Sequence, residues 1–148
     1  MKFVSFYHDG DEGFGAIKDD YIIDLSKGLL SGENFTSLKA LFKGGGSSTE
    51  SLKETVENGS NIIEMSEVNF RMPIFNPGKI FCVGRNYYAY HEVMEDGRPD
   101  WPSIFPRFSD SFAAHEQAII RGTDDADQLD YEGELVVVIG KQGRHIPE

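Results

Sequence analysis

The sequence is almost free of cysteine, because Cys82 is the single one among 148 residues. One thiol cannot form an internal disulfide, and it cannot supply the cluster of thiolates that holds a structural zinc ion. Disulfide-stapled secreted scaffolds and zinc fingers are therefore excluded. Low cysteine use also favours a reducing compartment, and we predict a cytoplasmic protein.

A long apolar run is also lacking. The first residues, MKFVSFYHDGDEG, turn acidic too early for the apolar core of a secretory signal. Nowhere in the sequence do about 20 apolar residues follow one another, which is the length that a membrane-spanning helix needs. We therefore expect neither export by that route nor a membrane partner.

Basic residues are scarce relative to acidic ones. There are 14 lysine and arginine residues against 25 aspartate and glutamate residues, for a formal net charge of −11. Proteins that bind nucleic acids neutralise phosphates with basic side chains, so we expect no nucleic-acid partner. An acidic surface suits a protein that collects divalent cations, and it equally suits a surface that binds only water.

Apolar residues make up 39% of the sequence and aromatic residues 12%, which is enough for a folded core. In residues 1–70, the segments KFVSFY, FGAI and DDYIIDL are separated by acidic turns, a pattern that predicts β-hairpins. TSLKALFK, opening with Thr36, and TESLKETVE, opening with Thr49, predict two short helices joined by a flexible connector at 44–48.

The character of the sequence changes after residue 70. KIFCVG is typical of a short strand, RNYYAYHEVMED of a helix, and WPSIFPRF of an extended segment interrupted by proline. QAIIRG and ELVVVIGK predict further strands. We therefore predict an α+β, β-rich fold with a small N-terminal domain at 1–70 and a second domain at 71–148.

Two carboxylates stand at the head of the apolar run YEGELVVVIG, which spans residues 131–140. In a strand, Glu132 and Glu134 would point to the same face about 7 Å apart. The residues that follow are apolar on both faces, so we expect a covered strand in which two ionised carboxylates repel each other and lose hydration. A hard cation would compensate, and the alternative is a solvated strand end without metal.

The ordered segments KIFCVGRNYYAYHEVME, PSIFPRF and LDYEGELVVVIGK resemble the fumarylacetoacetate hydrolase family. The resemblance covers residues 72–148, and the preceding part is similar to the small domain that often precedes the family's catalytic domain. It implies a mixed β-roll or sandwich preceded by a small hairpin and helix domain. It also implies metal-dependent hydrolysis, decarboxylation, isomerisation or hydration of small 2-oxo or diketo carboxylic acids, through an enolate.

Through this resemblance, Glu132 and Glu134 match the family's E-x-E metal ligands. Mg²⁺ is the expected ion, with Mn²⁺ or Ca²⁺ as alternatives, because the ligands are hard oxygens. The family's third ligand, an Asp further along, and a substrate-contacting Lys beyond it have no counterpart in these 148 residues. The resemblance therefore implies a catalytic domain that is incomplete within this chain.

The resemblance also suggests a general base. The family places a His after the Asn of its N-Y motif and pairs it with a nearby Glu. At the matching position this sequence has Tyr90, and His91 comes one residue later, a rotation of about 100° on a helix. A shifted helix start would restore the register, with Glu95 or Glu92 as the partner of His91; otherwise His91 is a lid residue without catalytic duty.

Two arginines are candidates for substrate binding. Arg85, in RNYY, could hold a substrate carboxylate in a forked geometry or form an ordinary salt bridge. Arg107, in FPRFS, lies where many relatives carry a Lys near the pocket. The neighbouring tyrosines are interpreted as packing residues.

Two hypotheses of different classes follow. The first is a divalent-metal-dependent enzyme that acts on a small oxo acid. The second is a truncated or split, non-catalytic subunit that binds a complementing chain. Both predict an oligomer, most simply a homodimer, because an apolar strand without neighbours invites association.

Overall fold

The computed structural model describes residues 1–43, 49–94, 97, 99–123 and 128–147. Contacts divide the chain into a first unit, Met1–Ile74 with Ala113–Glu148, and a second unit, Phe75–Phe112. Each unit is described by itself. The connector predicted at 44–48 and the candidate residue Glu95 lie outside the described residues.

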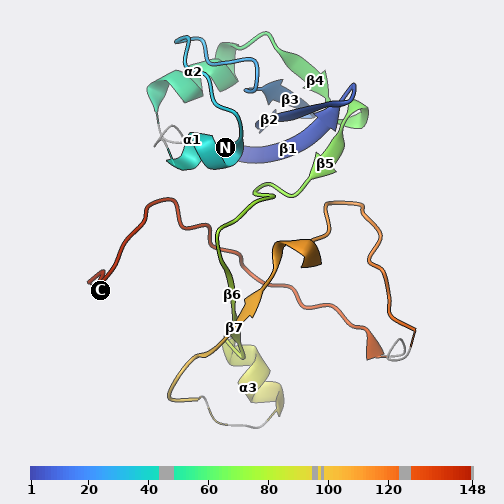
Figure 1. Ribbon diagram of the computed structural model, residues 1–148, viewed down its shortest axis with the longest axis vertical. Helices are drawn as coiled ribbons and strands as arrows, with labels where there is room; N and C mark the ends of the chain where they lie inside the picture. Colours follow the sequence, from blue (N-terminus) through green and yellow to red (C-terminus); the bar gives the residue numbers. More distant parts are fainter. Residues whose placement is uncertain (44–48, 95–96, 98, 124–127, 148) are drawn as a thin grey trace. The chain divides into compact units, whose positions relative to one another are not determined.

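The first unit contains a five-stranded antiparallel sheet in the order β4-β3-β2-β1-β5 (Figure 1). Its strands are β1 (Lys2–His8), β2 (Asp11–Lys18), β3 (Tyr21–Asp24), β4 (Ile62–Glu64) and β5 (Asn69–Arg71). A short 3₁₀ helix, η2 (Met65–Glu67), joins β4 to β5. The predicted hairpins of the first 24 residues are confirmed.

The turn between β1 and β2 explains why this hairpin forms. His8 pairs with Asp11, so Asp9 and Gly10 make up a two-residue loop. Their φ angles are 51° and 87°, and positive φ at both positions is what the favoured hairpin turns require. Aspartate and glycine are among the residues that adopt this conformation most readily, so the acidic turn sets the register of the strands.

Two helices, α1 (Leu38–Lys43) and α2 (Glu50–Asn58), lie beside the sheet (Figure 1). The hydroxyl of Thr49 accepts a hydrogen bond from the backbone N–H of Leu52 at 3.2 Å, which confirms Thr49 as the N-cap of α2. For α1 the cap is Ser37, whose Oγ accepts from Ala40 N at 3.2 Å. The prediction that this helix opens with Thr36 is therefore wrong by one residue.

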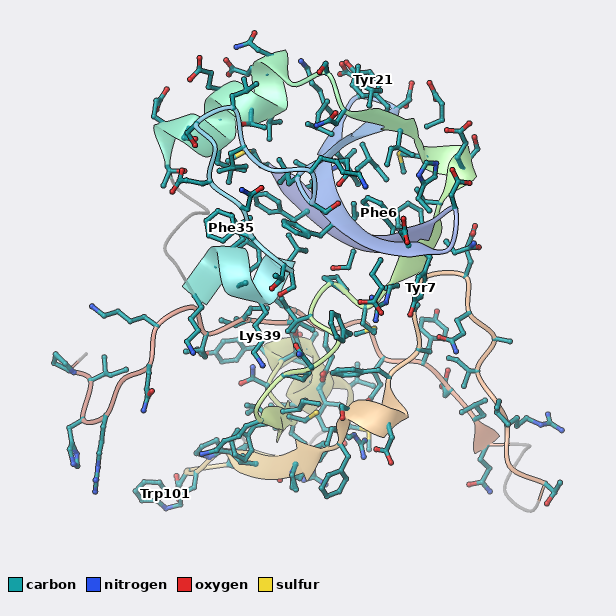
Figure 2. All side chains as sticks on the ribbon, turned by 45° about the horizontal axis from the view of Figure 1, so that its top comes forward. Phe6, Tyr7, Tyr21, Phe35, Lys39 and Trp101 are labelled. Atoms are coloured by element: carbon teal, nitrogen blue, oxygen red, sulfur yellow. The ribbon has the colours of Figure 1, made fainter. Side chains whose placement is uncertain are left out.

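The sheet has apolar side chains on both faces. One cluster joins the sheet to both helices and contains Phe14, Ala16, Ile23, Leu25, Leu29, Leu38, Leu41, Leu52 and Val56. The other contains Phe6, Ile22 and Ile63, and Phe6 lies within the sheet in Figure 2. Burial of one such side chain stabilises a fold by about 1.5–3 kcal/mol, so these clusters are the main source of stability in this unit.

The end of β3 includes a buried carboxylate that is satisfied locally. Asp24 is 4% exposed and accepts hydrogen bonds from the backbone N–H of Ser26 at 2.9 Å and from the Ser26 hydroxyl. The Asp24 backbone N–H donates to Asn61 O at 2.8 Å. This aspartate therefore has a structural role at the point where the chain leaves the sheet.

The second unit contains a two-stranded antiparallel sheet of β6 (Ile80–Gly84) and β7 (Ser103–Arg107). The helix α3 (Tyr88–Met94) follows β6, and a 3₁₀ helix, η3 (Ser109–Ser111), follows β7. The predicted strand at KIFCVG and extended segment at WPSIFPRF are confirmed, and the predicted helix is confirmed within the described part of RNYYAYHEVMED. Trp101, just before β7, projects away from the ribbon and is 83% exposed (Figure 2).

The two remaining strand predictions are wrong for this structure. Residues 117–122 and 134–141 have no strand conformation, and their side chains are exposed. A strand is stable only when neighbouring strands accept its backbone hydrogen bonds, and the sheets of the described residues comprise only β1 to β7. The apolar composition of these two segments was therefore not sufficient to make them strands.

The fold is mixed α+β and sheet-rich, as predicted. The domain limits predicted at 1–70 and 71–148 stay a prediction. Within the described residues, no helix combines the length and the apolar character needed to cross a bilayer.

Candidate functional site

The predicted metal ligands lie in the C-terminal segment, which we define as the described residues 113–123 and 128–147. Glu132 and Glu134 are both exposed, and the residues around them have no regular backbone structure. The prediction of a covered strand with buried carboxylates is therefore wrong here. An exposed carboxylate keeps its hydration, so the electrostatic demand for a compensating cation does not arise from burial in this chain.

The chemistry of the two side chains still suits a divalent ion. Glu132 and Glu134 supply carboxylate oxygens, which Mg²⁺, Mn²⁺ and Ca²⁺ accept as ligands. Among the described residues, no group of three or more His, Cys, Asp or Glu side chains is arranged to hold a metal. The donor type therefore fits a magnesium-class ion, while two carboxylates leave most ligand positions to water or substrate oxygens.

The second group of candidates lies where β6 leads into α3. Gly84 ends β6, Arg85 follows with a φ of 55°, and α3 begins at Tyr88. His91, in the middle of α3, places its ring nitrogen Nε2 2.9 Å from the backbone oxygen of Arg85. The structure thus brings together Arg85 and His91, which the sequence analysis named separately.

The ring of Tyr90 contacts this pair. The rings of Tyr90 and His91 meet edge to face, with centroids 5.6 Å apart and planes at 86°. The guanidinium carbon of Arg85 lies 5.9 Å from the centroid of the Tyr90 ring, within the range of a cation–π contact. Tyr90 therefore contacts both candidate residues.

The two proposed carboxylate partners of His91 are not equivalent. Glu92 is exposed and directly follows His91, so its side chain leaves the helix about 100° away from the imidazole. Glu95 lies outside the described residues. Its role as the partner of His91 stays a prediction.

Arg107 lies at the opposite end of the β6–β7 ladder from Arg85. It pairs with Ile80 at the start of β6, whereas Arg85 follows Gly84, which pairs with Ser103. Five residues of strand correspond to about 17 Å. The guanidinium of Arg107 lies 5.1 Å from the Phe105 ring centroid. The backbones of the two arginines are therefore not side by side.

Two of the other histidines, His8 and His115, contact side chains of the first unit. His8 Nε2 lies 3.8 Å from the neighbouring Asp9 carboxylate, His145 is exposed, and the ring of His115 meets Phe70 edge to face at 5.6 Å. The Phe70–His115 contact borders an apolar hollow of about 260 Å³ in the first unit. None of the predicted site residues lines this hollow.

Sequence reasoning missed the contribution of the backbone. A left-handed φ at an arginine has no sequence signal, since this conformation is enriched in glycine, asparagine and aspartate. Tyr90 was read as a packing residue, and its position next to His91 was the available signal for a contact with the candidate base.

Comparison with known proteins now identifies the second half of the chain. The family model described as fumarylacetoacetate (FAA) hydrolase C-terminal matches residues 79–148. Residues 79–148 belong to the fumarylacetoacetate hydrolase family. The matched region contains Arg85, His91, Arg107, Glu132 and Glu134, so all described candidates lie in the fumarylacetoacetate hydrolase segment.

Individual relatives agree with this assignment. The chain is 33% identical over 104 residues to the oxaloacetate tautomerase fahd2, mitochondrial, of Xenopus laevis, an alignment that covers 70% of this chain and 32% of the relative. It is 38% identical over 97 residues to the oxaloacetate tautomerase YisK of Bacillus subtilis, covering 64% of this chain and 32% of the relative. Proteins named as tautomerases thus occur among its bacterial and animal relatives.

A third relative matches both halves of the chain. The fumarylacetoacetate hydrolase domain-containing protein 2 homolog of Dictyostelium discoideum is 32% identical over 142 residues, which is 90% of this chain. The alignment covers 43% of that relative. The chain therefore spans less than half the length of these three fumarylacetoacetate hydrolase relatives.

Proposed function

We propose that the chain is part of a divalent-metal-dependent enzyme that interconverts the keto and enol forms of a small 2-oxo carboxylic acid such as oxaloacetate. The observation that carries the proposal is the assignment of residues 79–148 to the fumarylacetoacetate hydrolase family, with relatives named oxaloacetate tautomerases. Hydrolysis of a C–C bond and decarboxylation pass through the same kind of enolate, so the proposal names the simplest member of that group of reactions.

Tautomerisation moves one proton from carbon to oxygen. One proton leaves the carbon next to the 2-oxo group, the C–H electron pair forms a C=C bond, and the oxo oxygen receives a proton. The reaction needs a base for the carbon, stabilisation of the developing oxyanion and an anchor for a carboxylate.

His91 is the proposed base. Imidazole is the side chain that most often transfers protons near neutral pH. His91 is partly exposed on α3, and its hydrogen bond to Arg85 O at 2.9 Å orients the ring within the second unit. Glu95 is kept as its proposed partner.

Arg85 is the proposed anchor for a substrate carboxylate. Its guanidinium can donate two parallel hydrogen bonds to one carboxylate, and its backbone oxygen lies 2.9 Å from His91 Nε2. Arg107 starts from the far end of the β6–β7 ladder, so we assign it a contact with a more distant part of the substrate.

Glu132 and Glu134 are the proposed holders of the divalent ion, Mg²⁺ or Mn²⁺, with Ca²⁺ as a weaker candidate. A bound ion of this class would polarise the 2-oxo group. Their carboxylates would supply two hard oxygen ligands and bring negative charge to the cation.

The first test is a tautomerase assay on the full chain. Loss of the enol form of oxaloacetate is followed by its ultraviolet absorbance, with Mg²⁺, with Mn²⁺ and with a chelator. We expect metal-dependent acceleration that His91→Gln lowers on the order of 10²-fold, the usual contribution of a general base. Acceleration that is unaffected by chelator and by His91→Gln would contradict the proposal.

The second test addresses the metal. Isothermal calorimetry at millimolar Mg²⁺ or Mn²⁺ should detect binding in the wild type and a loss of binding in Glu132→Gln and Glu134→Gln. Glu67→Gln is the matched control, because Glu67 is an exposed glutamate of the first unit outside the candidate set. Equal binding by the control and the two site variants would assign the affinity to general surface charge.

A second candidate function, a split subunit that works with another chain, is favoured by one observation. The side chains of Leu135, Val136, Val137, Val138 and Ile139 are between 56% and 83% exposed. Clustered exposed apolar residues of this kind are typical of a surface that another polypeptide covers, either a second copy or a complementing chain.

Light scattering after gel filtration tests this candidate. We expect a dimer or larger species at micromolar concentration, and Leu135→Lys should shift it towards the monomer. Leu30→Lys is the matched control, since Leu30 is also exposed, at 56%, and lies between β3 and α1, outside the 135–139 run. A wild-type monomer would count against self-association, and metal binding that appears only after a second polypeptide is added would support the complementing chain.

A further inference from the structure

Asn58 is followed by glycine, a pairing that occurs at no other asparagine of the sequence. The other asparagines precede Phe35, Ile62, Phe70, Pro77 and Tyr87. The side-chain carbonyl carbon of an asparagine can be attacked by the backbone nitrogen of the next residue, and a side chain on that residue hinders the attack. Gly59 presents no such hindrance, and asparagine is one of the heat-labile residues of proteins.

The structure explains why glycine stands at this position. Asn58 is exposed and is the last residue of α2, and Gly59 is the C-cap with an extended backbone. A Cβ on Gly59 would collide with Thr55 O and would lie 3.1 Å from the Cγ2 atom of Ile23, which is buried. The packing of the helix end therefore requires glycine, and it places a reactive dipeptide on the surface of the first unit.

One hydrogen bond protects the attacking nitrogen. The backbone N–H of Gly59 donates to Thr55 O at 2.7 Å and closes the last turn of α2. The nitrogen must lose this proton in order to attack, and the helix hydrogen bond shields it from base, as it does in amide hydrogen exchange. Thr55 is itself held, because its hydroxyl donates to Ser51 O at 2.8 Å and accepts from Leu30 N at 3.0 Å. The attack therefore requires the last turn to open.

We propose that Asn58–Gly59 is a site of spontaneous deamidation whose rate is set by opening of the last turn of α2, and that its isoaspartate product releases strand β4 from β3. This inference concerns the first unit, and it is independent of the proposed tautomerase function.

The reaction balances with water as the co-reactant. The Gly59 nitrogen loses its proton and forms a bond to Cγ of Asn58, and the Cγ–Nδ2 bond breaks, so that Nδ2 leaves with that proton as ammonia. Water then opens the cyclic imide. Cleavage of the new N–Cγ bond gives aspartate, whereas cleavage at the Asn58 backbone carbonyl gives isoaspartate, in which the main chain passes through Cβ and Cγ. No oxidation or reduction takes place.

The isoaspartate product lengthens the connection between α2 and β4. It inserts an additional backbone atom before Gly59, where packing against Thr55 O and Ile23 leaves no room for a side-chain carbon. Shortly afterwards, Asn61 O accepts the Asp24 N–H at 2.8 Å, next to the β3–β4 ladder. Because β4 is a short strand at the edge of the sheet, a displacement of Gly59 should break this hydrogen bond first.

Peptide mapping of the full chain tests the site and its rate. The protein is kept at mildly alkaline pH in buffer and in concentrated guanidinium chloride, and tryptic peptide 54–71 is followed by mass spectrometry. Asn61 and Asn69 lie in the same peptide and serve as references. We expect deamidation at Asn58 before either reference, at least about 10-fold faster in denaturant than in buffer. Equal rates in the two solutions, or an unmodified Asn58 in denaturant, would overturn the proposal.

A matched pair of threonine variants tests the turn. Thr55→Val keeps the shape of the side chain but leaves the Leu30 N–H without its acceptor, so the rate in buffer should rise about 10-fold and the rate in denaturant should not change. Thr36→Val makes the same change at an exposed threonine, and both of its rates should equal those of the wild type. A wild-type rate for Thr55→Val in buffer would overturn the role of the turn.

Hydrogen exchange measured by NMR provides a readout on the wild type itself, which decides the question even if Thr55→Val does not fold. Deamidation and exchange of the Gly59 amide need the same opening, so the ratio of the two deamidation rates should match the protection of this amide within about threefold. A larger disagreement would show that another step sets the rate.

The amide of Asp24 tests the effect on β4. In the purified isoaspartate form it should exchange at least about 10-fold faster than in the wild type, because its acceptor Asn61 O is displaced. Asn58→Asp is the control, since it introduces the new charge with the normal backbone and should keep the protection of Asp24. Unchanged protection in the isoaspartate form would overturn the release of β4, and equal loss in Asn58→Asp would assign the effect to charge.

Discussion

Two apolar segments of this chain differ in the burial of their side chains. In β2, Phe14 and Ala16 are 2% and 0% exposed, because β1 and β3 pair with the strand on both sides. In the C-terminal segment, Val136 and Val137 are 81% and 73% exposed, although LVVVIG is the more apolar sequence. All buried residues of the described chain lie between Ser5 and Ile63. Apolar composition gives a segment the capacity to be a strand, and neighbouring strands decide whether it becomes one.

The difference follows from where the neighbours lie in the sequence. β2 finds its partners across turns of two residues, so the entropy lost in closing those loops is small. The C-terminal segment has no such hairpin partner among the described residues. In the proposed assembly, its partners belong to another polypeptide.

Hydrogen exchange should show the largest contrast between the two segments. Backbone amides in β2 are held in ladders on both sides, so they should exchange at least about 10³-fold more slowly than those of 135–140, as expected for global stabilities above a few kcal/mol. Mass spectrometry of peptic fragments provides the measurement. Strong protection of 135–140 in the wild type that disappears in Leu135→Lys would instead show that an assembly covers this segment.

Truncation of an isoleucine should have a smaller but still large effect. Ile22 in β3 is 0% exposed, and Ile22→Ala should lower the free energy of unfolding by about 2–5 kcal/mol. Ile120, at 95% exposure, is the matched control, and Ile120→Ala should change it by less than about 0.5 kcal/mol. Urea unfolding followed by far-ultraviolet circular dichroism gives both values, and equal losses would remove the distinction between the two regions.

A pair of glycines extends the comparison to the two sheets. A Cβ on Gly15 in β2 would collide with the backbone oxygen of Ile23 in β3, which cannot move without breaking the ladder. Gly15→Ala should therefore cost about 1–3 kcal/mol of stability. A Cβ on Gly84 in β6 would meet no atom closer than Phe105 Cε1 at 3.4 Å. Gly84→Ala should leave the same unfolding transition unchanged, and a larger loss for Gly84→Ala would contradict the register described for β6.

The smallest predicted effect distinguishes two threonines. Thr49 caps α2 through its hydroxyl, so Thr49→Ala should destabilise the first unit by about 1 kcal/mol. Thr36 is exposed and precedes the capping residue Ser37, so Thr36→Ala should cost less than about 0.5 kcal/mol. Thermal unfolding of both variants is the measurement, and equal shifts in Tm would mean that Thr36 also caps its helix.

Much of the first unit was predictable from local signals. The turn residues Asp9 and Gly10, the cap Thr49 and the spacing of Leu52 and Val56 each act within a few residues, which is the range over which sequence patterns are informative. The cap of α1 was misplaced by one residue because Thr36 and Ser37 are both good caps, and only the backbone geometry selects between them.

The candidate site was predictable to a lesser degree. The residue types and the family resemblance were enough to name Arg85, His91, Glu132 and Glu134, and the family assignment of 79–148 is confirmed. The expected burial of the carboxylates was wrong, because burial depends on what covers a segment. The contact between His91 and Arg85 could not be foreseen, since it requires a backbone conformation that arginine seldom adopts.

The sequence by itself determined the hairpins, the two helices of the first unit and the membership of residues 79–148 in the fumarylacetoacetate hydrolase family. These features depend on interactions between residues close in the chain, or on an ordered set of motifs. Only the tertiary structure decided that LVVVIG is exposed and that His91 Nε2 donates to the carbonyl of Arg85. Burial and hydrogen-bond partners depend on which atoms meet in space, and that depends on every element around them.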